Sequence, residues 1–148
     1  LTSPYLILDS RFLPSLCMAA QSGVQVRVLC PRQGDRGFVH MVTRSYYGTL
    51  LRAGAEVWEY SPGFIHAKMA VCDGRAAIIG TANLDFRSLY LHHECAVALW
   101  GVPAVGEMVR DLEATLARSQ RVTLDELAAE PWYKKLAAAV LRLFAPLM

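Results

Sequence analysis

The residues with the clearest chemical capacity lie in the stretch HAKMAVCDGRAAIIGTAN, which begins at His66. His66 and Lys68 interrupt an apolar run, and Thr81 and Asn83 close the stretch. Because residues two apart on a strand share a face, His66 and Lys68 are expected side by side. A hairpin at the intervening Asp-Gly pair would bring Thr81 and Asn83 back beside them. The pattern predicts one patch that holds an imidazole, an ammonium, a hydroxyl and an amide.

Such a patch suits a phosphoryl group. Lys68 would supply a compact positive charge, and Thr81 and Asn83 would supply neutral donors for the charge that develops in phosphoryl transfer. His66 can act as the nucleophile through a neutral ring nitrogen. It then needs an acceptor that fixes its tautomer. Glu94, at the start of a predicted strand, is the candidate for that acceptor.

Each of these residues also has a structural explanation when it is taken alone. A histidine on a strand is most often structural, and Lys68 fits a solvated strand position. Asp73 has two open roles, because it can orient the lysine or simply form the turn with Gly74. Only the joint spacing favours a site over these separate explanations.

A metal centre is not favoured. The run His92-His93-Glu94-Cys95 looks metal-binding at first, but adjacent residues on a strand point to opposite faces and cannot converge on one ion. The cysteines form no C-x-x-C pair, and most of them lie among apolar neighbours: Cys17, Cys30, Cys72 and Cys95. This favours reduced thiols in a reducing compartment and argues against a structural zinc site.

The composition fits one domain with a real core. The chain has 148 residues, of which 54% are hydrophobic and 19% are charged, and its net charge of +2 argues neither for nor against nucleic acid. No apolar run reaches the roughly 18 residues of a membrane span, and no signal-peptide pattern is present. The chain starts at Leu1 and enters a predicted strand almost at once, so we expect an excised piece of a longer protein.

Strand and helix patterns alternate, which predicts a layered α/β domain. Strands are expected at 5–8, 24–30, 56–60, 64–72, 76–79 and 94–100. Helices are expected from Asp9 or Ser10 to 22 and at 38–53, 103–120, 123–129 and 131–147, with Gly23 and Gly54 closing the first two. In the strand at 64–72, the side chains opposite His66 are expected to face the core: Ile65, Ala67, Met69 and Val71.

The last predicted helix is amphipathic. Residues 131–148 hold three basic residues and no acid. The apolar side carries Trp132, Leu136, Val140, Leu143, Phe144 and Leu147, and the other side carries Lys134, Lys135 and Arg142. Helices on membrane surfaces have this pattern, and so do helices packed on their own domain. We favour packing, although the apolar stripe alone does not discriminate between the two.

The spacing H-x-K, four residues, D, six residues, G-T-x-N resembles the signature of the phospholipase D superfamily, in which the position of Thr81 is usually serine and sometimes threonine. The resemblance implies an α/β/α sandwich with a mixed central sheet. It implies His66, Lys68 and Asp73 as catalytic residues, with His66 forming a phosphohistidine. Lys68 and Asn83 would bind the phosphate, and no metal or other cofactor would be required.

Beyond the motif, the chain resembles the C-terminal half of bacterial cardiolipin synthases. The matching segments are Ser45-Tyr46-Tyr47, Leu51-x-x-Gly54, Glu59-Tyr60-x-Pro62-Gly63-Phe64, Gly80 to Ser88, Trp132 and Ala145-Pro146-Leu147. The resemblance implies a single phospholipase D-like domain over 1–148 with a helical tail at about 123–148. It implies transfer of a phosphatidyl group between phosphatidylglycerol molecules at the cytoplasmic side of a bacterial cell membrane, with this part itself soluble.

Enzymes of that kind carry two motif copies, and this chain carries one. The expected partners are therefore the other motif-bearing half or a second identical chain, together with the membrane surface. A homodimeric nuclease or phosphodiesterase of the same superfamily is the first alternative, but the charge of +2 and the acidic helix at 107–130 give it little support, and no nucleic acid is expected. A non-catalytic membrane-docking module with a vestigial motif is the second, and the intact motif argues against it.

Overall fold

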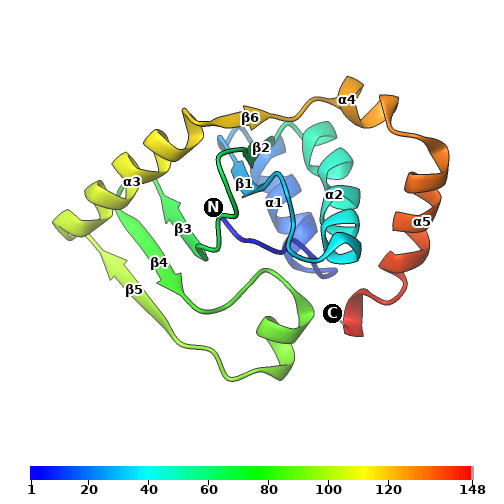
Figure 1. The fold of residues 1–148 in the computed structure, drawn as a ribbon. Helices are drawn as coiled ribbons and strands as arrows, with labels where there is room; N and C mark the ends of the chain where they lie inside the picture. Colours follow the sequence, from blue (N-terminus) through cyan, green and yellow to red (C-terminus); the bar gives the residue numbers. More distant parts are fainter. Residues whose placement is uncertain (148) are drawn as a thin grey trace.

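Two three-stranded ladders form the framework of the computed structural model, which describes residues 1–147 (Figure 1). The first ladder has the order β1 (Arg27–Pro31), β2 (Glu56–Tyr60) and β6 (Ser119–Arg121), with β1 and β2 parallel and β6 antiparallel to β2. The second is antiparallel, in the order β3 (Met69–Cys72), β4 (Ala76–Gly80) and β5 (Ala96–Trp100). The predicted α/β class with a mixed sheet is confirmed.

The N-terminal segment joins the two ladders. Thr2 forms a parallel bridge with Leu29 of β1 and an antiparallel bridge with Met69 of β3, and Leu6 forms a parallel bridge with Leu84. The backbone N–H of Thr2 donates to the carbonyl of Met69 at 2.8 Å. The regular strand predicted at 5–8 is therefore wrong. The segment pairs with a different element at each end, so its pairing is limited to isolated bridges.

The helices agree well with the predicted ranges. They are α1 (Phe12–Gln21), α2 (Gly37–Arg52), α3 (Pro103–Leu116), α4 (Leu124–Ala129) and α5 (Trp132–Arg142), with a π-helical turn η1 (Arg87–Leu91) and a 3-10 turn η2 (Ala145–Leu147). Asp9 Oδ1 accepts the backbone N–H groups of Arg11 and Phe12 at the start of α1. None of these helices, among residues 1–147, is long and apolar enough to cross a membrane.

The core lies between α2 and the β1–β2 pair. Its largest fully buried side chains include Tyr46, Tyr47 and Leu50 of α2, packed against Val28 and Val57. Burial of these apolar groups is the main stabilising contribution.

An ion-pair network ties this core to the C-terminal helices. Glu59 is buried at the end of β2, and its pairing with Arg44 of α2 compensates its charge. Arg44 also bonds to Glu130 at 2.9 Å, just after α4. Removing Arg44 would leave a buried carboxylate without its cation.

One further strand prediction and one helix prediction need correction. The strand predicted at 64–72 begins only at Met69, so His66 and Lys68 precede β3 in an extended segment. Its ladder with β4 starts at the Met69–Ile79 pair, and the residues expected in the core, such as Met69 and Val71, are only half-buried. The helix predicted at 103–120 ends at Leu116, and β6 follows it. Pairing with β2 creates β6, although Ser-Gln-Arg carries no strand signal.

Candidate active site

His66 lies in the extended segment just before β3, and its side chain is exposed. Its ring packs against Phe64, with ring centroids 5.5 Å apart, and stands edge-on to Tyr5 at 6.4 Å. Tyr5 is itself held by a 2.6 Å hydrogen bond from its hydroxyl to Asp35. Burial and this hydrogen bond raise the pKa of Tyr5 to about 12. Two aromatic rings thus hold an imidazole that remains open to solvent.

The side chain of Lys68 contacts the main chain of His66. Its Nζ donates to the carbonyl oxygen of His66 at 2.8 Å. Its side chain also lines a mostly apolar cavity of about 200 Å³ together with Asn83. Burial lowers the pKa of Lys68, while the charges of Glu94 and Asp85 oppose that shift. The ammonium is thus only slightly desolvated, and its hydrogen bond to His66 is exposed to solvent.

Asn83 and Thr81 differ in their availability to a ligand. The buried Oδ1 of Asn83 has no hydrogen-bond partner among residues 1–147. This oxygen can accept from a ligand's donor, whereas a phosphate oxygen would need the Nδ2 group of the same amide. The hydroxyl of Thr81 instead donates to Glu94 and accepts the backbone N–H of Cys95 at 3.0 Å. The hydroxyl hydrogen of Thr81, predicted to bind phosphate, is therefore occupied by Glu94.

Glu94 does not orient His66 in this structure. Among residues 1–147, the recorded hydrogen bond of Glu94 comes from Thr81, and its Oε1 lies 3.9 Å from Nδ1 of His92. The Thr81 hydrogen bond is the largest cause of the lowered pKa of Glu94, followed by Ser88. The carboxylate thus remains ionised and contributes negative charge near Lys68.

Asp73 lies apart from the other motif residues. It forms the β3–β4 turn with Gly74, with φ values of 51° and 62°. Positive φ at both central residues is typical of a type I′ hairpin turn. The length of β3, about 13 Å, separates this turn from Lys68. Of the two roles that the sequence left open, this geometry favours the turn, and the catalytic role of Asp73 is not supported.

Gly80 is required by a close approach of two strands. A Cβ on Gly80 would lie 2.3 Å from the carbonyl oxygen of Cys95 and 2.7 Å from Cα of Ala96. The backbone N–H of Gly80 also donates to the carbonyl of Lys68 at 3.1 Å. Only glycine allows β5 to pass this close to the lysine-bearing segment.

The loop after Asn83 is held by residues that sequence reasoning did not assign to the site. The Ser3 hydroxyl accepts the N–H of Leu84 at 3.1 Å, and Leu84 accepts the N–H of Ile7 at 2.7 Å. Buried Asp85 accepts the N–H of Ser88 at 2.7 Å. Asp85 lies in a stretch that carried the resemblance, whereas Ser3 carries no sequence signal.

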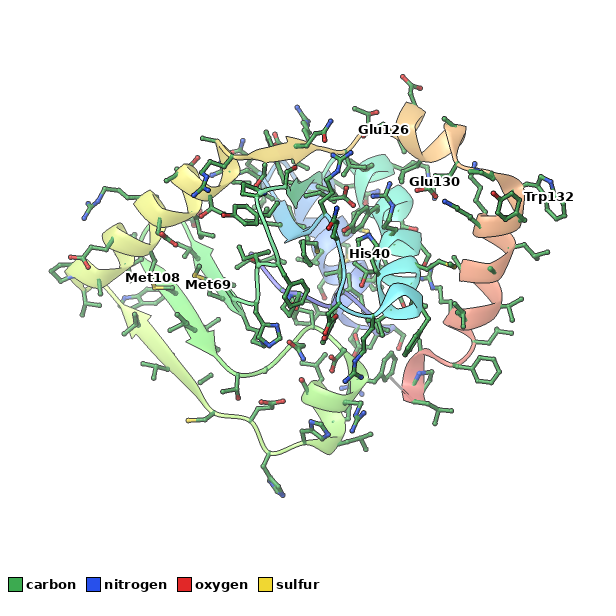
Figure 2. All side chains as sticks on the ribbon, viewed as in Figure 1. His40, Met69, Met108, Glu126, Glu130 and Trp132 are labelled. Carbon is green, nitrogen blue, oxygen red and sulfur yellow. The ribbon has the colours of Figure 1, made fainter. Side chains whose placement is uncertain are left out.

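α3 lies beside the second ladder, where Figure 2 labels Met69 on β3 and Met108 on α3.

Within residues 1–147, no group of three or more His, Cys, Asp or Glu side chains is placed to hold a metal ion. The cluster His92 to Cys95 accordingly forms no metal centre in the described part of the chain.

An α/β fold with an H-x-K segment before β3 and an asparagine in the loop after β4 is the arrangement of a phospholipase D-like domain. The chain matches the family model described as "Cardiolipin synthase, PLD-like domain" over residues 1–116, and it belongs to this family.

Curated relatives agree over the whole chain. It is 37% identical over 146 residues to a cardiolipin synthase of Geobacillus kaustophilus, covering 99% of this chain and 29% of that protein. It is 36% identical over 146 residues to the major cardiolipin synthase ClsA of Bacillus subtilis, covering 99% of this chain and 30% of that protein. The chain thus spans less than a third of these relatives.

Solved structures support the fold. Nuc of Salmonella typhimurium, a phospholipase D family member, superposes with a TM-score of 0.71 at 16% identity, covering 82% of this chain and 78% of Nuc. The phosphatidylserine synthase of Haemophilus influenzae superposes with a TM-score of 0.72 at 14% identity, covering 99% of this chain and 41% of that one. At these identities the likeness establishes the phospholipase D fold and no particular activity.

Proposed function

We propose that this chain is the motif-bearing half of a cardiolipin synthase-like phosphatidyltransferase, which moves a phosphatidyl group from one phosphatidylglycerol to a hydroxyl of another and releases glycerol. Residues 1–148 would form one phospholipase D-like domain with its helical tail at about 123–148. The observation that carries the proposal is that Lys68, which contacts the main chain of the exposed His66, shares a cavity with Asn83. The relatives named cardiolipin synthases support the choice of substrate.

The reaction would proceed in two balanced steps. A neutral ring nitrogen of His66 attacks phosphorus, and the P–O bond to the glycerol headgroup breaks. Lys68 and Asn83 hold the non-bridging oxygens and offset their charge. The hydroxyl of the second phosphatidylglycerol then attacks phosphorus and gives its proton to the group that protonated the leaving glycerol, the P–N bond breaks, and the neutral imidazole is restored. The products are cardiolipin and glycerol.

The leaving glycerol alkoxide needs a proton from the opposite side of phosphorus, because in-line displacement places the attacking and leaving atoms opposite each other. His66 cannot attack and protonate at once. His40, His92 and His93 lack a lysine two residues further on. Burial also lowers the pKa of His40, which disfavours it as a proton donor. A second H-x-K motif, from the other half of a longer chain or from a second copy, would supply the acid.

The test measures phosphatidyl transfer in mixed micelles and the sedimentation of the same sample across protein concentration. We expect no transfer from the monomer, and activity that rises with the dimer or on adding the other motif-bearing half. Full specific activity in a strictly monomeric sample would contradict the two-histidine proposal. Hydrolysis of simple phosphodiesters or nucleic acid without lipid transfer would favour the nuclease or phosphodiesterase alternative.

A further inference from the structure

The apolar side of α5 faces outward. Six large apolar side chains along α5 and the residues that follow it are exposed: Trp132, Leu136, Val140, Leu143, Phe144 and Leu147. Leu143 and Leu147 are 77% and 76% exposed. In Figure 2 the Trp132 side chain points away from the body of the molecule. This is the stripe that the sequence predicted, but it does not pack on the domain.

The opposite side of α5 makes the packing contacts. Ala138 and Ala145 are buried, and Leu141 packs against the core. The Arg142 guanidinium lies 4.0 Å from the centroid of the Tyr46 ring on α2. Small side chains and one cation–π contact thus fix the helix, so the expectation that α5 packs through its apolar stripe is wrong.

A second exposed apolar segment, η1, lies near the C-terminal end of the chain. Leu89, Tyr90 and Leu91 of η1 are exposed, and the Tyr90 hydroxyl donates to Asp9. Burial raises the pKa of Tyr46, and the charges of Arg142 and Asp9 act on it in opposite directions. In Figure 1, η1 and the C-terminal end lie at the same lower edge.

The polar side of α5, opposite the stripe, carries basic residues. Residues 131–148 contain no acid, and Lys134 is exposed without a hydrogen bond or ion pair among residues 1–147. Lys135 instead donates to the carbonyl of Ala128 at 2.8 Å. Trp132 and Tyr133 stand edge to face at the first turn of α5, with ring centroids 6.4 Å apart. Aromatic rings, leucines and a free lysine are the side chains of a helix that lies in a lipid interface.

We infer that the outward stripe of α5, together with η1, binds the surface of an anionic bilayer. This inference rests on the proposed function and names the surface that would hold the site against its lipid substrate. The leucines and Phe144 would enter the boundary between headgroups and acyl chains, and Lys134 would face the anionic headgroups. Exposed leucines flanked by aromatic rings at the first turn of the helix fit the boundary between headgroups and acyl chains.

The test is flotation of the chain with vesicles of phosphatidylglycerol and phosphatidylcholine, and with phosphatidylcholine alone. Trp132→Ser and the pair Leu143→Ser with Leu147→Ser are expected to weaken partitioning, the pair by at least about tenfold. Trp100→Ser is the matched control, because Trp100 is 73% exposed and Trp132 is 74% exposed. It should bind as the unsubstituted chain does. Lys134→Gln should weaken binding to the anionic vesicles alone, by about fivefold.

Circular dichroism verifies that each variant folds. In a background with Trp58→Phe and Trp100→Phe, which leaves Trp132 as the single tryptophan, quenching by brominated lipid gives a second readout without altering the stripe. Equal binding by the Trp132 and Trp100 variants, or no quenching, would overturn the inference. The inference would also be overturned if stripe substitutions abolished association between copies of the chain but left vesicle binding unchanged. Because no turnover is measured, a failure here leaves the proposed chemistry intact, and a failure of the chemistry leaves this result intact.

Discussion

The ammonium of Lys68 donates a 2.8 Å hydrogen bond to the main-chain carbonyl of His66, two residues earlier. This bond turns the charged end of Lys68 toward the segment that carries the imidazole. The same side chain lines the cavity that Asn83 also lines. In the proposed reaction, Lys68 would neutralise the phosphate that His66 attacks.

Replacing Lys68 by methionine should therefore remove transfer with little change in folding. We expect a loss of roughly 10²–10³ in turnover, the range found when one donor to a developing oxyanion is removed. Lys68→Arg should not restore activity, because a planar guanidinium cannot replace a compact ammonium in so small a cavity. Lys135→Met, measured in detergent micelles, is the matched control, because the exposed Lys135 donates to the carbonyl of Ala128 and lies outside the proposed site. Turnover of Lys68→Met within a few-fold of the unsubstituted chain would rule out this role.

Gly80→Ala should destabilise the fold. The added Cβ would overlap the carbonyl of Cys95, so β5 would have to move. We expect a loss of about 1–3 kcal/mol in the free energy of unfolding, measured by urea denaturation. Gly37→Ala is the control, because its Cβ would meet no atom within 4 Å. If both variants unfold at the same urea concentration, the strands do not approach as described.

Glu94 should make stability depend on pH in the acid range. The Thr81 hydroxyl, with Ser88, lowers the pKa of Glu94 below its ordinary value of 4.5. A carboxyl with a lowered folded-state pKa stabilises the fold above the unfolded value, and that contribution is lost as pH falls through the folded value. Thr81→Val should raise the pKa of Glu94 and flatten this dependence below about pH 4.5. Carboxyl titration by NMR measures both, and an unchanged pKa in Thr81→Val would show that the hydrogen bond is absent.

Transfer should persist in EDTA. In the proposed reaction, Lys68 supplies the positive charge that offsets the negative charge of the phosphate. The nucleophile is a histidine rather than a metal-bound hydroxide. The assay belongs in detergent micelles, so that effects of divalent ions on lipid packing are separated from effects on chemistry. Loss of turnover that one particular divalent ion restores would favour metal-assisted hydrolysis instead.

Local signals were sufficient for much of the fold. The alternation in residues 56–60 predicted β2 with its observed bounds, and the Asp-Gly pair predicted the β3–β4 turn. β6 has no local signal, because it exists only through pairing with β2. The apolar stripe of α5 was visible, but periodicity does not say which side of a helix faces the core. Ala138 and Ala145 are buried, so the side of α5 that carries them faces the domain.

The candidate site was also predictable only in part from the sequence. Spacing along one hairpin was enough to place Lys68 and Asn83 together, since strand pairing returns one toward the other. The partner of Glu94 depends on the register of β5 against β4, in which Ala96 faces Gly80. That register puts Thr81, rather than His66, within reach of Glu94. Sequence spacing does not determine it.

The most direct test of the account is to trap the covalent intermediate. The chain, paired with a second motif-bearing half, is quenched during turnover of labelled phosphatidylglycerol, and the modified peptide is identified by mass spectrometry. The account predicts a phosphatidyl group on His66 that is absent from the folded His66→Asn variant, which should have no steady-state transfer. An intermediate on any other side chain, the partner's histidine included, or continued turnover by His66→Asn, would contradict it.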